Sequence, residues 1–139
     1  MNHAVFVESD MIGMTISEQI SQLEFRDEIE GLIREWASRL DLQHWHLIVN
    51  LDADDDLATC SAQPQYMTAT LNFNIQRMSR EILTRRALED LVLHELVHAR
   101  LWTLANMFNG ADARLLEFVE EEAVTQMTGA LLRSKYNDD

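Results

Sequence analysis

Residues 91–104 are the segment of this 139-residue chain that most restricts how it can fold. Its apolar residues cover nearly the whole circumference of a predicted helix. Such a helix has to be largely buried, so the other elements are expected to enclose it. Polar groups on a buried helix need partners. Those in this segment are His94, Glu95, His98, Arg100 and Thr103.

Residues 94–98 read His-Glu-Leu-Val-His. On a helix, side chains at positions i and i+4 point the same way, so His94 and His98 could bind one metal ion. Zinc readily takes imidazole nitrogen, and it lowers the pKa of a bound water so that a neighbouring base can accept the proton. Glu95, at the edge of the same face, could be that base. The alternative is a pair of hydrogen-bonded histidines in the core.

A third ligand is expected from the following helix, which carries Glu117, Glu120, Glu121 and Glu122. At about 100° per residue, Glu120 falls near the centre of one apolar stripe. A carboxylate on a buried face is costly unless a cation neutralises it, so Glu120 is the predicted ligand. Glu117 and Glu121 lie toward one border, where they could replace Glu120 or hydrogen-bond the ligands. The stripe consists of Leu116, Val119, Ala123, Val124, Met127 and Leu131.

The rest of the chain contains both helical and strand patterns. A Thr-x-x-Glu capping box at Thr15 predicts a helix that runs to about Leu40, after residues 1–14, which form a short strand or an irregular arm. Apolar residues that alternate with polar ones predict strands at 45–51 and 69–75. A weaker pattern at 57–63 is typical of a third strand.

The last third of the chain is predicted to be helical. One helix begins at about Ser79 or Thr84 and ends near Met107, a turn follows at Asn109-Gly110, and a second helix spans about 111–135. The order predicts an α+β fold, with a small twisted sheet packed on the N-terminal helix, the 91–104 helix and the C-terminal helix. No linker or repeat divides residues 1–139, so one domain is expected.

Charge and composition argue against several classes of partner. The formal net charge of −13 disfavours nucleic acid, because an acidic surface repels phosphate. Charged residues interrupt every apolar run, so no membrane span is predicted. The lone Cys60 and the absence of a leader-like segment are typical of a cytoplasmic, reduced protein.

The motif His94-Glu95-x-x-His98, followed 22 residues later by Glu120-x-x-Ala123, resembles the gluzincin pattern of thermolysin-like zinc peptidases. It is especially similar to the small zincin-like metallopeptidases of bacterial and phage genomes, over roughly residues 42–135. The resemblance implies a minimal zincin-like domain with Zn²⁺ held by His94, His98 and Glu120. It also implies that Glu95 is the general base and proton shuttle in peptide-bond hydrolysis.

The resemblance further implies a peptide or protein substrate, paired along strand 69–75 as an open sheet edge. Such enzymes supply a Tyr or His to stabilise the oxyanion, and the candidates here are Tyr66, His44 and His46. Two other functions stay open at this point. One is a non-catalytic, zinc-containing module that binds a peptide or protein, and the other is a zinc hydrolase of a non-peptide amide. The sequence indicates neither the substrate specificity nor the oligomeric state.

Overall fold

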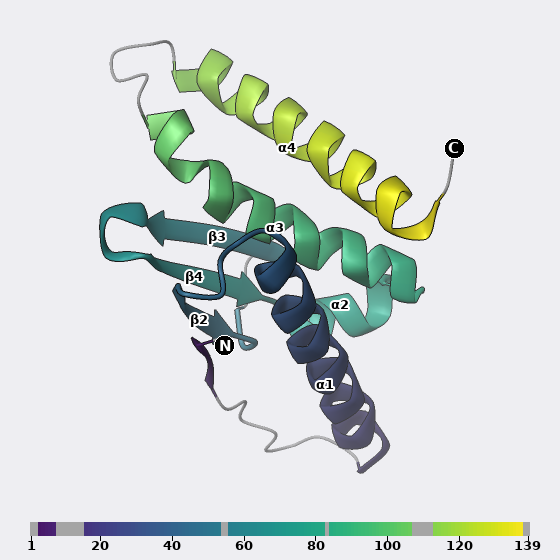
Figure 1. Ribbon diagram of the computed structural model, residues 1–139. Coiled ribbons are helices and arrows are strands. Elements are labelled where there is room, and N and C mark those ends of the chain that lie inside the picture. Colours follow the sequence, from purple (N-terminus) through teal and green to yellow (C-terminus); the bar gives the residue numbers. More distant parts are fainter. Residues whose placement is uncertain (1–2, 8–15, 54–55, 83, 107–112, 138–139) are drawn as a thin grey trace.

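The computed structural model describes residues 3–7, 16–53, 56–82, 84–106 and 113–137 (Figure 1). These residues form an α+β fold, as the order of the predicted elements indicated. The elements are β1 (His3–Val7), α1 (Ile16–Arg39), β2 (His46–Asn50), β3 (Ala58–Gln63), β4 (Thr68–Phe73), α2 (Ile75–Glu81), α3 (Arg85–Asn106) and α4 (Ala113–Tyr136), with a 3₁₀ turn at Pro64–Tyr66.

The four strands form one mixed sheet in the order β1-β2-β4-β3. The short 3₁₀ turn joins β3 to β4, which pair antiparallel as a tight connection requires, whereas β1 and β4 both run parallel to β2. The predicted alternation is confirmed, because alternate residues of β2 and β4 are buried on one face. These residues are Leu47, Val49, Ala69, Leu71 and Phe73.

Two predictions about strand 69–75 are wrong. It is not an open edge, because β4 lies between β2 and β3, and β3 is the outer strand on that side. The strand also ends at Phe73, because the side chain of Asn74 accepts a hydrogen bond from the backbone N–H of Arg77 and caps the unpredicted helix α2. Ile75 is therefore buried as the first residue of helix α2, although the sequence predicted it to be part of a strand.

Helix α3 lies between the sheet and α4 (Figure 1). Its start matches the later of the two predicted ones, because the hydroxyl of Thr84 accepts a hydrogen bond from the backbone N–H of Ala87. Apolar residues from α1, α2, α4 and the sheet complete the core around it. The predicted burial of this helix is thus confirmed over its described side chains. The fully buried ones include Val92, Leu93, Leu96, Val97 and Ala99.

Helix α4 runs antiparallel to α3 and buries only a narrow face (Figure 1). Val124, Thr128 and Leu132 are on that face. The broader stripe predicted from the sequence is wrong at Val119 and Met127, which are 52% and 41% exposed, and at Ala123, which is exposed as well. The reason is that α4 packs mainly on one neighbouring helix, which can cover only part of its apolar surface.

Two sequence predictions lie outside the described residues: the capping box at Thr15 and the turn at Asn109-Gly110. Residues 3–7 of the N-terminal segment form β1, in agreement with the strand alternative for residues 1–14. Within the described part of the chain, no helix is both long and apolar enough to cross a membrane.

Candidate metal centre

Helix α3 holds His94 and His98 on the side that faces α4. The two residues are one helical turn apart, and their ring centroids are separated by 4.9 Å. His98 is only 9% exposed, and the side chain of His94 is 22% exposed. The fold therefore places two imidazoles together in a partly enclosed space, as the spacing in the sequence predicted.

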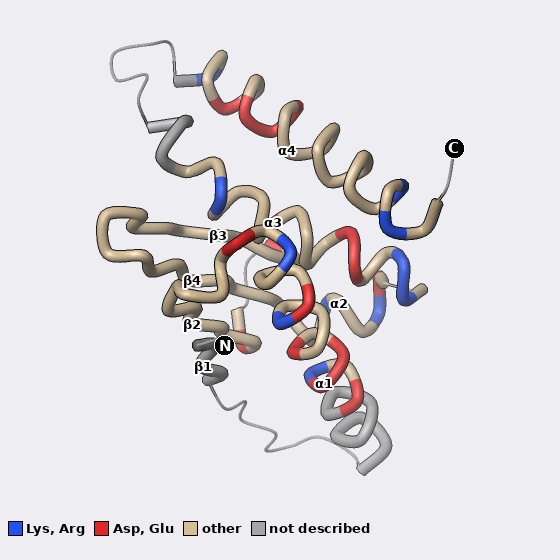
Figure 2. Tube along the Cα trace, in the orientation of Figure 1, with Lys and Arg blue, Asp and Glu red and all other residues tan. Residues whose placement is uncertain are grey.

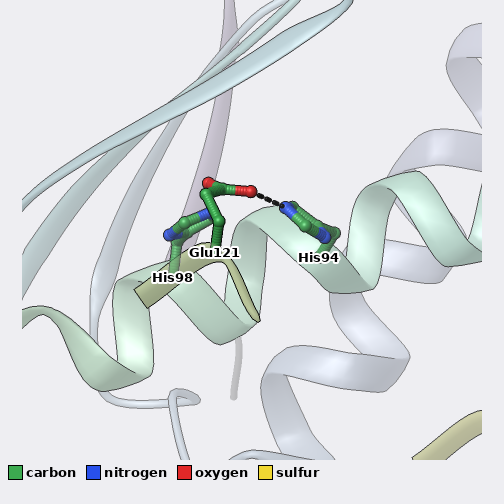
Figure 3. A group of neighbouring side chains, drawn as sticks. All are labelled: His94, His98 and Glu121. Carbon is green, nitrogen blue, oxygen red and sulfur yellow. Dashed lines mark ion pairs between the residues drawn. The ribbon is translucent and has the colours of Figure 1, made fainter. Parts of the chain in front are cut away.

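Glu121 on α4 contacts both histidines, and Figure 3 marks its ion pair with His94. One carboxylate oxygen lies 3.3 Å from Nε2 of His94, and the other lies 2.7 Å from Nε2 of His98. One ligand atom from each of the three residues lies within 4.8 Å of the other two. In tetrahedral zinc sites the ligand atoms lie about 3.3 Å apart, since zinc–ligand bonds are about 2.0–2.1 Å long. This donor set therefore fits a zinc ion in chemistry and in approximate spacing.

Glu120 contacts the other nitrogen of the same imidazole. Its Oε1 lies 3.4 Å from Nδ1 of His98, so this ring lies between two carboxylates of α4. A carboxylate in this position can accept the Nδ1–H hydrogen bond and leave Nε2 free to bind a metal. The predicted role of Glu120 as a ligand stays a prediction, but the residue that the fold brings to both Nε2 atoms is Glu121.

The four glutamates of α4 thus differ in their contacts. Figure 2 shows the acidic residues gathered in the first half of this helix. Glu117 and Glu122 are exposed and have no ion pair with either histidine in the described structure. Glu121 is 52% exposed, in agreement with the predicted border position, and its side chain reaches inward from that border. Sequence reasoning offered Glu121 as an alternative but could not position its carboxylate.

Glu95 is beside this group and has no partner among the described residues. It is only 6% exposed, and its carboxylate makes no hydrogen bond or ion pair there. Burial raises the pKa of Glu95 to about 7; the neighbouring His98 opposes this rise and Glu121 adds to it. Glu95 and His94 both line a cleft of about 470 Å³. A buried carboxylate is suited to general acid–base chemistry when its oxygens are not held by a hydrogen bond or ion pair and it lies next to two imidazoles.

Cys60 is a neighbour of the site that sequence reasoning did not identify. It is half-buried on the same side of β3 as Ala58 and Ala62, an alternation that the sequence contains. Burial and the charges of Glu95 and Glu120 raise the pKa of the Cys60 thiol to about 12. The side chain therefore stays a neutral thiol at physiological pH.

The three candidates for stabilising an oxyanion are all exposed. Tyr66 is 71% exposed, and His44 and His46 are on the surface at the start of β2. None of them forms a hydrogen bond or ion pair with the histidines or glutamates of the site within the described residues. Their assignment to this role stays a prediction.

No protein-family model, curated protein or solved structure matches this chain. Its function is therefore inferred from the site alone.

Proposed function

We propose that this protein is a zinc-dependent peptidase of the zincin type. The observation that supports this best is the group formed by His94, His98 and Glu121, next to a buried Glu95 that has no partner in the described part of the chain and lies at the wall of a cleft. Two imidazoles and one carboxylate are a ligand set of catalytic zinc sites, which keep a further position for water. The motif contributes two of the three ligands and the base on a single helix, α3, and α4 contributes the third ligand.

Each residue then has a distinct role. A zinc ion bound by this group would act as a Lewis acid that polarises the peptide carbonyl and makes water more acidic. Glu95 accepts the proton of the attacking water and returns it to the leaving amine. Glu120 holds the ring of His98 through Nδ1, which fixes the tautomer and the orientation of that side chain.

The sheet offers a place for an extended peptide. β3 is the outermost strand on the side of α3, so its outer edge is not paired with another described strand. A peptide can add to such an edge through backbone hydrogen bonds. The start of β3 also lines the cleft with His94 and Glu95, so a peptide on this edge would pass the proposed metal centre.

The three consecutive glutamates of α4 provide a matched test. Zinc affinity is measured by competition with a chelating dye for wild type, Glu120→Gln, Glu121→Gln and Glu122→Gln. We expect the largest loss, about 100-fold or more, for Glu121→Gln, because a ligand is removed. Glu120→Gln should cost about tenfold, the lower end for a group that hydrogen-bonds a ligand. The exposed Glu122→Gln should bind zinc like wild type.

Other results would change the assignment. If Glu120→Gln loses more affinity than Glu121→Gln, Glu120 is the ligand, as the sequence predicted. If wild type binds no zinc, the histidines and glutamates are core contacts and the proposal fails. If zinc binds but no peptide is cleaved, the non-catalytic binding module is favoured. Cleavage of non-peptide amides alone would favour the third function.

A further inference from the structure

The cleft beside Glu95 extends along the first half of α3. It lies between this helix, the start of β3 and the end of α2, and it has a volume of about 470 Å³. Part of its wall is apolar, formed by Leu57, Ile82 and Leu91. This wall could pack against the aliphatic part of a side chain. The cleft begins at His94, so a group bound in it would be directly next to the proposed metal centre.

The polar lining of the cleft is mainly acidic. Asp56 and Asp90 line it, are exposed, and make no ion pair within the described residues. Arg77 also lines the cleft, but its guanidinium is paired with Glu81 on the same helix. The lining therefore carries excess negative charge, which attracts cationic groups and repels acidic ones.

Glu95, the proposed general base, gives a second indication that the cleft receives a ligand. More than nine-tenths of this residue is buried, it has no hydrogen-bond partner among the described residues, and it lines the cleft. A carboxylate enclosed to this extent is costly unless a donor reaches it, so its open hydrogen-bonding positions are available to water or to a ligand in the cleft.

We propose that this cleft binds the lysine or arginine side chain of a substrate, adjacent to the peptide bond that is cleaved. This inference rests on the proposed peptidase function and specifies its substrate class. Asp90 is one helical turn before His94, a rise of about 6 Å. The four-carbon stem of lysine can span that distance along the apolar wall and bring its ammonium to Asp90 and Asp56.

The first test uses the zinc-loaded full-length protein and a mixed-sequence peptide library, with the cleaved bonds identified by mass spectrometry. We expect lysine and arginine to be enriched at least about threefold at one position next to the cleaved bond. Asp90→Asn and Asp56→Asn should each reduce this enrichment. Asp90→Lys should shift it toward glutamate and aspartate. The matched control is Asp27→Asn, an exposed residue on α1 that should leave the profile unchanged.

The preference for cationic side chains would be overturned if wild type cleaves without it, or if the preference survives in both Asp variants. If wild type cleaves nothing, the peptidase proposal fails, and the cleft is tested separately by binding. Fluorescent alanine peptides with a central lysine or norleucine are titrated into metal-free protein and followed by anisotropy. Tighter binding of the lysine peptide that disappears in Asp90→Asn supports the cleft assignment, and equal affinity overturns it.

Discussion

Helix α3 carries two buried glutamates, six residues apart, in opposite surroundings. Glu89 is fully buried and accepts hydrogen bonds from Trp36, Lys135 and Tyr136. Glu95 is 6% exposed and accepts none from the described residues. Lys135 also contacts Glu35, so the network at Glu89 connects α1, α3 and α4. The network occupies the carboxylate oxygens of Glu89, whereas the carboxylate of Glu95 can exchange a proton with a molecule in the cleft.

The same contrast decides the pKa of each carboxyl group. Burial alone would raise the pKa of Glu89, but the hydrogen bonds from Lys135, Tyr136 and Trp36 outweigh burial and hold the pKa below its usual range. At Glu95 nothing outweighs burial, and the pKa rises to about 7. Burial disfavours the charged form of both carboxyl groups. The difference is that Glu89 has hydrogen-bond donors that stabilise its charge, which makes it a structural carboxylate, whereas Glu95 has none in the described part of the chain and is left able to react.

The largest effect is expected from Glu95→Gln. An amide cannot accept a proton from water, so peptide hydrolysis should fall by about 1,000-fold or more. Zinc content should persist, because no ligand is changed. The measurement is the initial rate of hydrolysis at saturating zinc, with metal content determined on the same sample. A variant that keeps more than a tenth of wild-type activity would show that Glu95 is not the base.

The second effect is on stability and is expected from Glu89. Glu89→Gln leaves Lys135 without its buried counter-charge and should lower the free energy of unfolding by about 2–3 kcal/mol. This is below the range for a fully enclosed pair, because the side chain of Lys135 is 14% exposed. Urea unfolding measures the change, and the exposed Glu122→Gln is the control. Combining Glu89→Gln with Lys135→Met should recover part of the loss; a fully additive loss would refute the pairing.

The third effect is a pair of opposite pH dependences in metal-free protein. The folded pKa of Glu95 is above its unfolded value of 4.5, so its stabilising contribution is complete below pH 4.5 and is lost as the pH rises toward 7. The folded pKa of Glu89 is lowered, so its contribution is present above pH 4.5 and is lost as the pH falls through the folded value.

Unfolding curves of wild type and the two Gln variants from about pH 2.5 to pH 8 measure these slopes, because the contribution of Glu89 is lost only below pH 4.5. Wild type should lose stability relative to Glu95→Gln by about 1 kcal/mol per pH unit between pH 4.5 and 7. The free energy of unfolding of wild type should exceed that of Glu89→Gln above pH 4.5, and this difference should shrink as the pH falls below 4.5. Slopes of the same sign for both variants would contradict the comparison.

The smallest effect concerns Thr128 on α4, a buried residue whose hydroxyl has no hydrogen-bond partner among the described residues. Thr128→Val replaces that hydroxyl with a methyl group of similar size. The free energy of unfolding should therefore rise by up to about 1 kcal/mol, because an unsatisfied polar group is removed. Chemical denaturation at pH 7 measures this gain. Destabilisation would mean that the hydroxyl does have a partner, such as a bound water.

Part of the candidate site could be predicted from the sequence because it is local. The positions of His94, Glu95 and His98 on one helix follow from the helical repeat, which fixes side chains four residues apart on one face. The burial of α3 follows from its apolar circumference. The alternation in β2 and β4 likewise indicated which residues face the core, since a strand has a period of two.

The choice between Glu120 and Glu121 could not be predicted in the same way. Helical phase put Glu120 at the centre of an apolar stripe, on the assumption that all apolar residues of α4 are buried. In the structure Val119 and Met127 are 52% and 41% exposed, so the buried face of α4 is narrower than predicted and is rotated about the helix axis. Glu120 then meets Nδ1 of His98, while Glu121 meets the two Nε2 atoms.

The sequence by itself determined the α+β class, most of the elements and the side chains that project together from α3, because these depend on contacts between residues close in the chain. The tertiary structure alone decided the order of the strands, and hence that β3 is an edge strand of the sheet and β4 is not. It also decided which glutamate reaches the histidines and which buried glutamate has no partner among the residues that the structure describes. Those features depend on how elements distant in sequence pack together, and small rotations of a packed helix change which atoms meet.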